Sequence, residues 1–214
     1  MLVRDRMSKN PYTITADMSI SEALSRMREF HVRRFPVLNK SGKLVGIVAE
    51  KDLLYASPSP ATALSIWEIH TLLAKLTVAE VMKKEIVTVT EDTPVEDAAR
   101  IMTDRKIGSL PVLRDGQLVG IITESDLFKL FQELLGARKK GVRLTILLPE
   151  VRGTLAKITT AIAQKGGYTH ALSTFLGEDP TNFLLTMKVA DVPKDTLVDT
   201  LKPLALEIID VRET

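Results

Sequence analysis

The sequence predicts an α+β protein: two tandem copies of one β-α-β-β-α unit, packed as a pseudo-two-fold pair, and then a separate βαββαβ domain. Two observations lead to this fold class. First, the chain repeats itself, since residues 3–53 match residues 78–127 at an offset of 75 that falls to 74 after one turn. Second, beyond residue 141 the hydrophobic pattern changes to a different order of strands and helices.

Composition limits the classes of function. The 214 residues include 29 Lys and Arg and 27 Asp and Glu, so the formal net charge is only +2. This balance argues against a basic nucleic-acid-binding surface. Cysteine is absent, which excludes disulfides, thiolate catalysis and Cys-based metal sites. No stretch reaches the ~18 apolar residues of a membrane helix, and charges come too early for a signal peptide. We therefore expect a cytoplasmic protein that binds neither membrane nor nucleic acid.

Each copy of the repeat is predicted element by element. Short β-favouring runs at 13–15 and 88–90 open the two units. The next segments carry apolar residues at the spacing of one helical face, namely Ile20, Ala23, Leu24 and Met27 in the first, and Val95, Ala98, Ala99 and Met102 in the second. Thr93 to Glu96 predicts a capping box with Pro94 as the first helical residue. Two strands follow, joined in the second unit by Asp115-Gly116, a strong hairpin signal. Helices are expected to begin at 50–54 and 124–128.

At roughly 50 residues, neither unit has enough apolar surface to fold alone, so we expect the two to pack together. The pattern resembles the CBS domain pair. The residues that carry the resemblance are Met7, the Pro36-Val37 and Pro111-Val112 steps, the stretches 44–47 and 118–121, and Asp52 and Asp126. The expected divisions are repeat 1 over residues 1–56, a connector helix over 57–77, and repeat 2 over 78–135. Such a pair implies an adenosine-containing ligand, with AMP, ADP or ATP preferred, in the clefts between repeats.

The second repeat holds the more complete ligand motif. Thr123, Ser125 and Asp126 match the family's hydroxyl-x-x-Asp pattern where a strand turns into a helix. A carboxylate accepts hydrogen bonds from both ribose hydroxyls, and hydroxyls with free helix-start N–H groups suit phosphate oxygens. The same pattern is also a helix capping box, and the two roles are compatible.

The first repeat departs from this pattern. It retains Asp52, but Ala49 and Lys51 stand where the second repeat has Thr123 and Ser125. We therefore expect its cleft to bind more weakly. Arg33 and Arg34 supply phosphate-binding charge or are merely solvated. Gly108 and Ser109 allow close approach of the backbone to a ligand or serve a turn. Pro111 completes the set of nucleotide-site residues that the resemblance implies.

The C-terminal part is a second module. A short basic linker at 136–141 leads to a strand at 142–148, a helix from about 154 that ends at Gly166-Gly167, strands at 168–176 and 182–189, a helix near Pro193 and a strand at 205–211. This is the βαββαβ order of a ferredoxin-like unit, assigned to residues 142–214.

That module resembles an ACT domain, a small regulatory module. Glu150, Gly153 and Leu155 match its acidic-x-x-Gly-x-Leu turn, and Thr169 lies near the position of a ligand-binding asparagine. Arg152 stands where proline is common, so amino-acid binding and simple dimerisation both stay open. The whole combination resembles the bacterial acetoin-utilisation accessory protein family, which implies a regulatory role near acetoin or acetyl-group metabolism.

Three functional classes compete. The leading hypothesis is a non-catalytic sensor that binds an adenosine ligand and transmits binding through the ACT-like domain. The alternative is a dimerising scaffold with degenerate sites that holds or regulates a partner enzyme. An enzyme is disfavoured, because His31, His70 and His170 are dispersed and no nucleophile motif or phosphate-binding loop occurs. We therefore expect a homodimer with no catalytic residue, no metal and no required cofactor.

Overall fold

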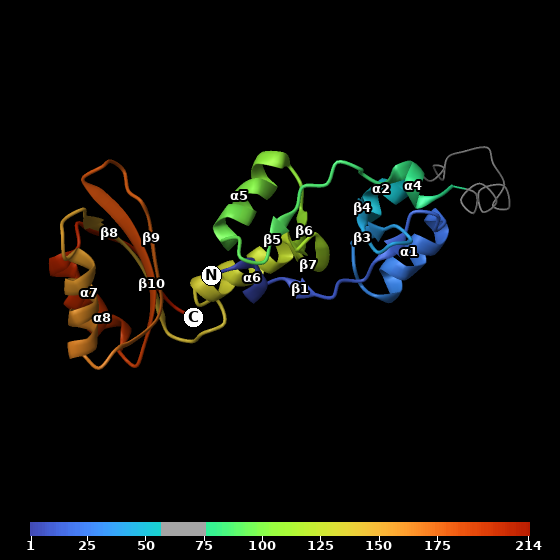
Figure 1. Ribbon diagram of the computed structural model, residues 1–214. Coiled ribbons are helices and arrows are strands. Elements are labelled where there is room, and N and C mark those ends of the chain that lie inside the picture. The colour runs from blue at the N-terminus through green and yellow to red at the C-terminus, as the bar shows by residue number, and fades with distance from the viewer. Residues whose placement is uncertain (57–75) are drawn as a thin grey trace. The chain divides into compact units, whose positions relative to one another are not determined.

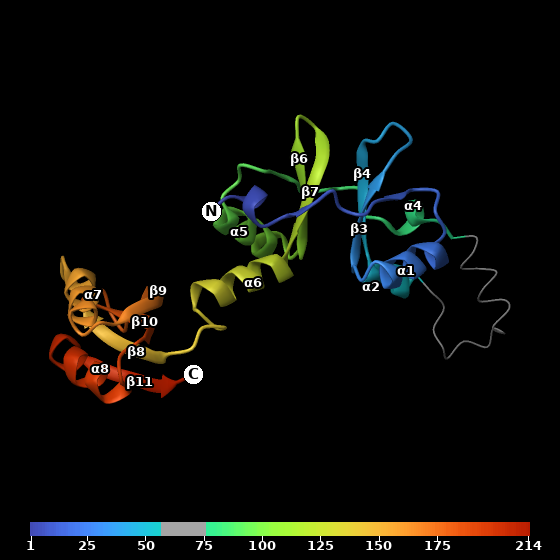
Figure 2. The same cartoon turned by 90° about the horizontal axis from the view of Figure 1, so that it is seen from below.

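The computed structural model describes residues 1–56 and 76–214, which form two compact units, Met1–Leu127 and Phe128–Thr214 (Figures 1 and 2). The predicted connector helix lies outside the described residues, apart from its last two positions. Within the part that the structure describes, no helix is both long enough and apolar enough to cross a membrane.

The first repeat has the predicted β-α-β-β-α order. Its sheet runs β2-β3-β4, with β2 parallel to β3 and β4 antiparallel to β3. The four apolar residues predicted for the helix α1 are all buried, and the Ser19 hydroxyl accepts a hydrogen bond from the Glu22 amide at 3.2 Å, which caps that helix. The elements are β2 (Ile14–Thr15), α1 (Ile20–Glu29), β3 (Arg34–Leu38), β4 (Leu44–Ala49) and α2 (Glu50–Tyr55).

The second repeat has the same order, and its sheet gains a strand from the N-terminus, giving β1-β7-β6-β5. Asp115 and Gly116 adopt φ values of 49° and 76°, which confirms the predicted two-residue hairpin. The elements are β1 (Ser8–Lys9), β5 (Val89–Thr90), α5 (Val95–Arg105), β6 (Ser109–Arg114), β7 (Gln117–Thr123) and α6 (Glu124–Leu134).

The predicted capping box at the start of α5 was wrong. The helix begins at Val95, and Pro94 is its cap residue, with an extended ψ of 140° and no side-chain cap. The Thr93 hydroxyl instead accepts a hydrogen bond from the Thr90 amide at 3.2 Å, closing the preceding turn. The Val95 amide donates to the Met1 carbonyl at 3.2 Å, so a distant segment satisfies the helix start.

Each repeat is completed by the segment that precedes the other repeat in the chain. The N-terminal 3-10 helix η1 (Val3–Asp5) and β1 lie on the second repeat, where β1 pairs with β7. The short helix α4 (Val78–Val81) leads into the first repeat, where Lys83 bridges Ile47 and Thr77 bridges Ser19. The two repeats therefore exchange matching segments.

Two methionines hold the exchanged segments in place. Met7 lies over Gly120, and its counterpart Met82 lies over Gly46. A Cβ atom at either glycine would overlap the methionine sulfur, so each glycine is required by the close approach of the neighbouring segment. Val3 and Val78, which begin the two segments, are fully buried.

The second unit is a four-stranded antiparallel sheet of order β11-β8-β10-β9. The core packs Ile158 and Ile162 of α7 and Leu197 and Leu201 of α8 against the sheet. The last strand starts two residues later than predicted, because a 3-10 turn (Lys202–Leu204) prolongs α8. The elements are β8 (Val142–Pro149), α7 (Thr154–Gln164), β9 (Tyr168–Leu176), β10 (Asn182–Ala190), α8 (Lys194–Leu201) and β11 (Glu207–Glu213).

Because the segment that contains Met7 packs on the second repeat, we expect truncation of Met7 to destabilise that repeat. Met7→Ala removes a buried side chain and leaves a cavity above Gly120, for which we expect a loss of about 2–5 kcal/mol. Amide hydrogen exchange in β6 and β7 measures this loss locally. Leu54→Ala, at a half-exposed position, is the control and should change protection little. Unchanged protection in β6 and β7 of the Met7 variant would contradict the packing role of the exchanged segment.

Candidate functional site

A small cavity of about 80 Å³ lies between the two repeats of the first unit. Its walls come from the end of β4 and the start of α2 in the first repeat, and from the start of β6 in the second. We refer to it as the first cleft, because its aspartate is that of the first repeat. The structure gathers here the predicted residues Arg34, Lys51, Asp52, Gly108, Ser109 and Pro111.

Sequence reasoning missed part of the lining. The segment just before β5 contributes Lys83, Glu85, Ile86 and Val87, and the end of α5 contributes Lys106 and Ile107. The repeat could have indicated these residues, because the offset of 75 matches residues 83–87 with residues 8–12 near the start of the chain. The exchange of segments brings Lys83, Glu85, Ile86 and Val87 to the first cleft.

The two motif aspartates have the same local role. Asp52 accepts a hydrogen bond from the Ala49 amide at 3.2 Å, and Asp126 accepts one from the Thr123 amide at 3.0 Å. The Thr123 hydroxyl adds a bond to Asp126 at 2.7 Å, which Ala49 cannot supply. Both aspartates thus close the strand-to-helix turn. Of the predicted nucleotide-site residues, Arg33, Thr123, Ser125 and Asp126 are not among those that line the first cleft.

An ion pair joins the two repeats beside this cleft. The Arg34 guanidinium lies 3.9 Å from the carboxylate of Glu124, the first residue of α6. Both side-chain ends lie over Gly108, where a Cβ atom would overlap them. Gly108 therefore allows the ion pair to approach the backbone, in keeping with the predicted close approach.

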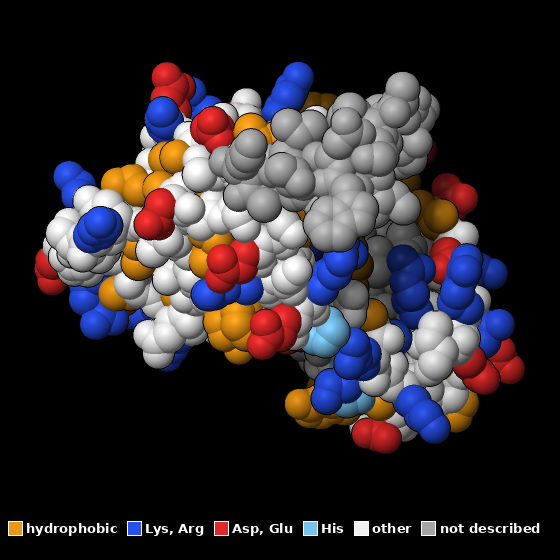
Figure 3. Space-filling model, turned by 90° about the vertical axis from the view of Figure 1, so that its right-hand side faces the viewer, with side chains coloured by type: hydrophobic (Ala, Val, Ile, Leu, Met, Phe, Trp, Pro, Cys, Tyr) orange, Lys and Arg blue, Asp and Glu red, His pale blue; other side chains and the backbone are white. Residues whose placement is uncertain are grey.

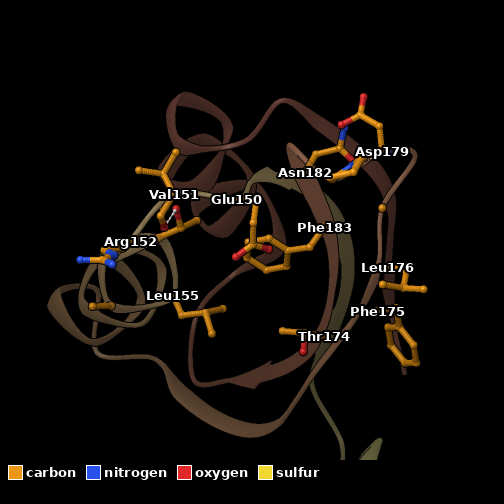
Figure 4. Close-up of a pocket in the computed structure, with 15 residues that line it drawn as sticks. Glu150, Val151, Arg152, Leu155, Thr174, Phe175, Leu176, Asp179, Asn182 and Phe183 are labelled. Atoms are coloured by element: carbon orange, nitrogen blue, oxygen red, sulfur yellow. Dashed lines mark hydrogen bonds between the residues drawn. The ribbon is translucent and has the colours of Figure 1, made fainter.

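A wider cavity of about 1070 Å³ lies in the second unit (Figure 4). It is formed by the loop between β8 and α7, the end of β9 and the start of β10. Glu150, Leu155 and Phe183 face its middle, while Arg152 extends away from Glu150 (Figure 4). The predicted ACT-type residues Glu150, Gly153 and Leu155 line the cavity, whereas Thr169 is not among its lining residues and pairs with Val189 near the other end of β9.

Two local features shape this cavity. Gly153 has a φ of 88° with open space beside it, so its turn favours glycine for conformational reasons alone. The Thr154 hydroxyl donates to the Val151 carbonyl at 2.8 Å and holds the turn. At the rim, the hydroxyl and amide of Thr181 donate to Asp179 and hold the pKa of that carboxyl below its ordinary value.

On the face seen in Figure 3, several Lys and Arg side chains gather at the lower right, with Asp and Glu side chains near them. Across residues 1–56 and 76–214, no group of three or more His, Asp or Glu residues has an arrangement that would hold a metal ion.

Sequence relatives match mainly the first unit. The chain is 35% identical over 136 residues to a CBS domain-containing protein from Dictyostelium discoideum, covering 63% of this chain and 94% of that protein. It is 33% identical over 133 residues to the L-aspartate semialdehyde sulfurtransferase of Methanocaldococcus jannaschii. That match covers 61% of this chain but only 23% of the enzyme, so it concerns one part of that protein.

Solved structures are similar over the same region. The CBS domain pair of protein MJ0100, in complex with 5′-methylthioadenosine and S-adenosyl-L-methionine, has a TM-score of 0.52 at 31% identity, covering 65% of this chain and 98% of that one. CBSX2 in complex with AMP has a TM-score of 0.52 at 31% identity, covering 62% and 97%. A Vibrio cholerae protein named for acetoin utilization, AcuB, has a TM-score of 0.53 at 30% identity, covering 64% and 95%.

The family model supports the internal repeat directly. The model of the CBS domain matches the chain twice, over residues 3–59 and 78–133. These two matches cover both β-α-β-β-α units and the segments that the units exchange. The chain belongs to the CBS domain family, as a tandem pair followed by a further α+β unit.

Proposed function

We propose that this chain is a regulatory sensor, without catalytic activity of its own, that binds an adenosine-containing ligand between its CBS repeats. The observation that carries the proposal is the first cleft, where Asp52 of one repeat and Gly108 to Pro111 of the other line one cavity. Two similar CBS pairs were solved with AMP and with S-adenosyl-L-methionine and methylthioadenosine, which supports this ligand class. We propose AMP, ADP or ATP, because the chain places basic side chains around the cleft.

The chemistry of the motif supports ribose binding. A carboxylate only accepts hydrogen bonds, and each motif aspartate lies at a strand-to-helix turn. Its bond to the backbone amide uses Oδ2 in both repeats. In the second repeat, the Thr123 hydroxyl can release Asp126 and turn to a ligand oxygen while the amide keeps the turn closed. Capping and ligand binding are therefore compatible roles of one motif.

Ligand binding requires the first cleft to widen. Ligand pockets usually measure about 300–1,000 Å³, whereas this cavity measures about 80 Å³. The side chains of Lys51, Lys83 and Lys106 are exposed, so they are able to move without disturbing the core. The walls formed by Ser109 and Pro111 are buried and stay in place. We propose that a ligand enters by displacing the basic side chains at the rim.

We further propose that the second unit is a ferredoxin-like ACT-type domain. Its βαββαβ order and its strand order support this assignment. Glu150, Gly153 and Leu155 around the wide cavity support a small ligand there. Thr169, near the other end of β9, is the weakest member of the proposed ligand set.

A homodimer is proposed on the character of β9. This strand lies at the edge of the sheet, contains no Asp, Glu, Lys or Arg, and exposes Tyr168, Phe175 and Leu176. The opposite edge strand, β11, is charged at Glu207, Asp210, Arg212 and Glu213. Charged edges resist pairing with other chains, and uncharged apolar edges favour it. This observation also supports the alternative function of a scaffold that dimerises and holds a partner enzyme.

Transmission to the second unit is proposed through α6. This helix begins directly after Thr123, carries Asp126 in its first turn, and continues to Leu134. The segment after it is bound to the sheet of the second unit, since the buried Lys188 ammonium donates to the Lys139 carbonyl at 2.9 Å.

A role in acetoin or acetyl-group metabolism is supported only by the similarity to AcuB.

Ligand-induced stabilisation tests the sensor. At about 100 times its dissociation constant, a nucleotide should stabilise the fold by about 2.7 kcal/mol. The double variant Asp52→Asn/Asp126→Asn should lose this shift, because both ribose acceptors are weakened. Asp104→Asn, on an exposed helix face, is the control and should keep it. If adenosine, AMP, ADP and ATP all leave the wild-type melting temperature unchanged at millimolar concentration, the sensor is rejected.

Light scattering tests the homodimer. We expect the mass of two chains at micromolar concentration, and the mass of one chain after Leu176→Lys, because a charge is then placed on the apolar edge. Ile209→Lys, on the charged strand β11, is the matched control and should stay dimeric. A wild-type mass of one chain, or equal behaviour of the two variants, speaks against β9 as the interface.

Hydrogen exchange tests the transmission. Saturating nucleotide should change amide protection in β8 or β11, both of which lie in the second unit. Couplings of this kind are typically about 1–3 kcal/mol, enough to be seen as altered protection. Changes confined to residues 1–127 would show that the second unit is only tethered.

A further inference from the structure

The first cleft has more basic than acidic residues in its lining. Among its lining residues are four basic and two acidic side chains, a net charge of +2. Three of the basic residues, Lys51, Lys83 and Lys106, have exposed flexible side chains at the rim. The fourth, Arg34, is partly buried and is held 3.9 Å from Glu124. The acidic residues are Asp52, which closes its own turn, and Glu85.

The internal symmetry identifies the corresponding positions of a second cleft, around Asp126. Lys83 bridges Ile47, and at the matching place Ser8 pairs with Ile121. Lys106 follows helix α5 with a φ of 52°, and His31 follows helix α1 with the same φ. The counterparts around Asp126 are therefore defined by structure as well as by the offset of 75 or 74 residues.

The second set of positions has two basic residues where the first has four, and its net charge is +1 where that of the first is +2. The lysines at 51, 83 and 106 are replaced by Ser125, Ser8 and His31. Glu85 is replaced by Asn10, and Gly108 by Arg33, the one basic residue that the second set gains. Arg34 and Ser109 both line the first cleft, and they occupy matching positions of the two repeats. The second set therefore contains the same two residues, with their places exchanged. With His neutral, the second set has two basic residues, Arg33 and Arg34, and one acidic residue, Asp126.

We propose that the two clefts select different adenosine ligands: the first cleft binds a ligand with two or three phosphates, and the Asp126 cleft binds one with a single phosphate or none. This inference rests on the proposed adenosine binding and deepens it. It also replaces the expectation that the first cleft is merely the weaker one, because the lysines supply charge where the hydroxyls of Thr123 and Ser125 are missing.

The physical reason is the number of phosphate charges that each set can neutralise. Each added phosphate brings further negative charge, and Lys ammonium groups on flexible stems reach several phosphate oxygens as mobile point charges. Arg33 offers one rigid fork, which suits a single phosphate held by two parallel hydrogen bonds. In the first cleft, the Arg34 guanidinium and the Glu124 carboxylate lie over Gly108, at the position where the second set has the side chain of Arg33.

Calorimetry on two variants separates the clefts. Asp126→Asn leaves the first cleft intact, and Asp52→Asn leaves the second; each full-length chain is titrated with adenosine, AMP and ATP in metal-free buffer. The Asp126 variant should bind ATP at least tenfold more tightly than AMP, which equals about 1.4 kcal/mol. The Asp52 variant should bind AMP or adenosine at least as tightly as ATP. Raising salt should reduce the ATP preference of the first cleft, because charges at the rim are screened.

Exchange of the rim residues provides the matched test. Lys83→Ser with Lys106→His gives the first cleft the residues of the second set at two positions and, in the Asp126→Asn chain, should lower its preference for ATP over AMP. Ser8→Lys with His31→Lys should create the preference in the second cleft. All four positions are exposed, so these variants are expected to fold.

The outcomes separate this inference from the proposed function. If the adenosine ligands bind, but the two clefts share one phosphate preference or the exchange variants do not alter it, the inference is overturned and the sensor stands. If none of the ligands binds the wild-type chain, the sensor and the inference fail together.

Discussion

The exchange of flanking segments between the two repeats is the constraint on which the first unit depends. A unit of roughly 50 residues buries too little apolar surface to be stable alone. Here each repeat lends the other a short segment, anchored by a buried valine and by a methionine over a glycine, Met7 on Gly120 and Met82 on Gly46. The same exchange brings residues 83–87 of the chain to the wall of the first cleft. Stability and site formation therefore have one origin.

The two repeats are alike in their backbone structure, whereas the side chains around their aspartates differ. Both repeats keep an aspartate that accepts a hydrogen bond from the amide three residues before it, at 3.2 Å for Asp52 and 3.0 Å for Asp126. Thr123 and Ser125 supply hydroxyl groups beside Asp126, whereas lysines from both repeats line the cleft around Asp52. A duplicated scaffold of this kind permits two sites of equal geometry and unequal charge, which is suited to comparing related ligands.

Much of the fold could be predicted, because the repeat made each element visible twice. The helix faces, the Asp115-Gly116 hairpin and the βαββαβ order followed from local patterns. The capping box at Thr93 failed because Met1, far away in sequence, satisfies the Val95 amide and leaves Thr93 to the preceding turn. Lys83 and Lys106 were missed as site residues for a similar reason. Their place in the first cleft depends on which segment packs on which repeat, and short-range periodicity carries no such information.

Co-crystallisation with ATP and adenosine together tests whether the two clefts select different ligands, because it shows which molecule lies in each cleft. We expect ATP in the first cleft, with its ribose on Asp52 and its phosphates near Lys83 and Lys106, and adenosine in the second cleft, with its ribose on Asp126. ATP phosphates on the Asp126 side with the first cleft vacant, or ligand density away from both aspartates, would contradict it.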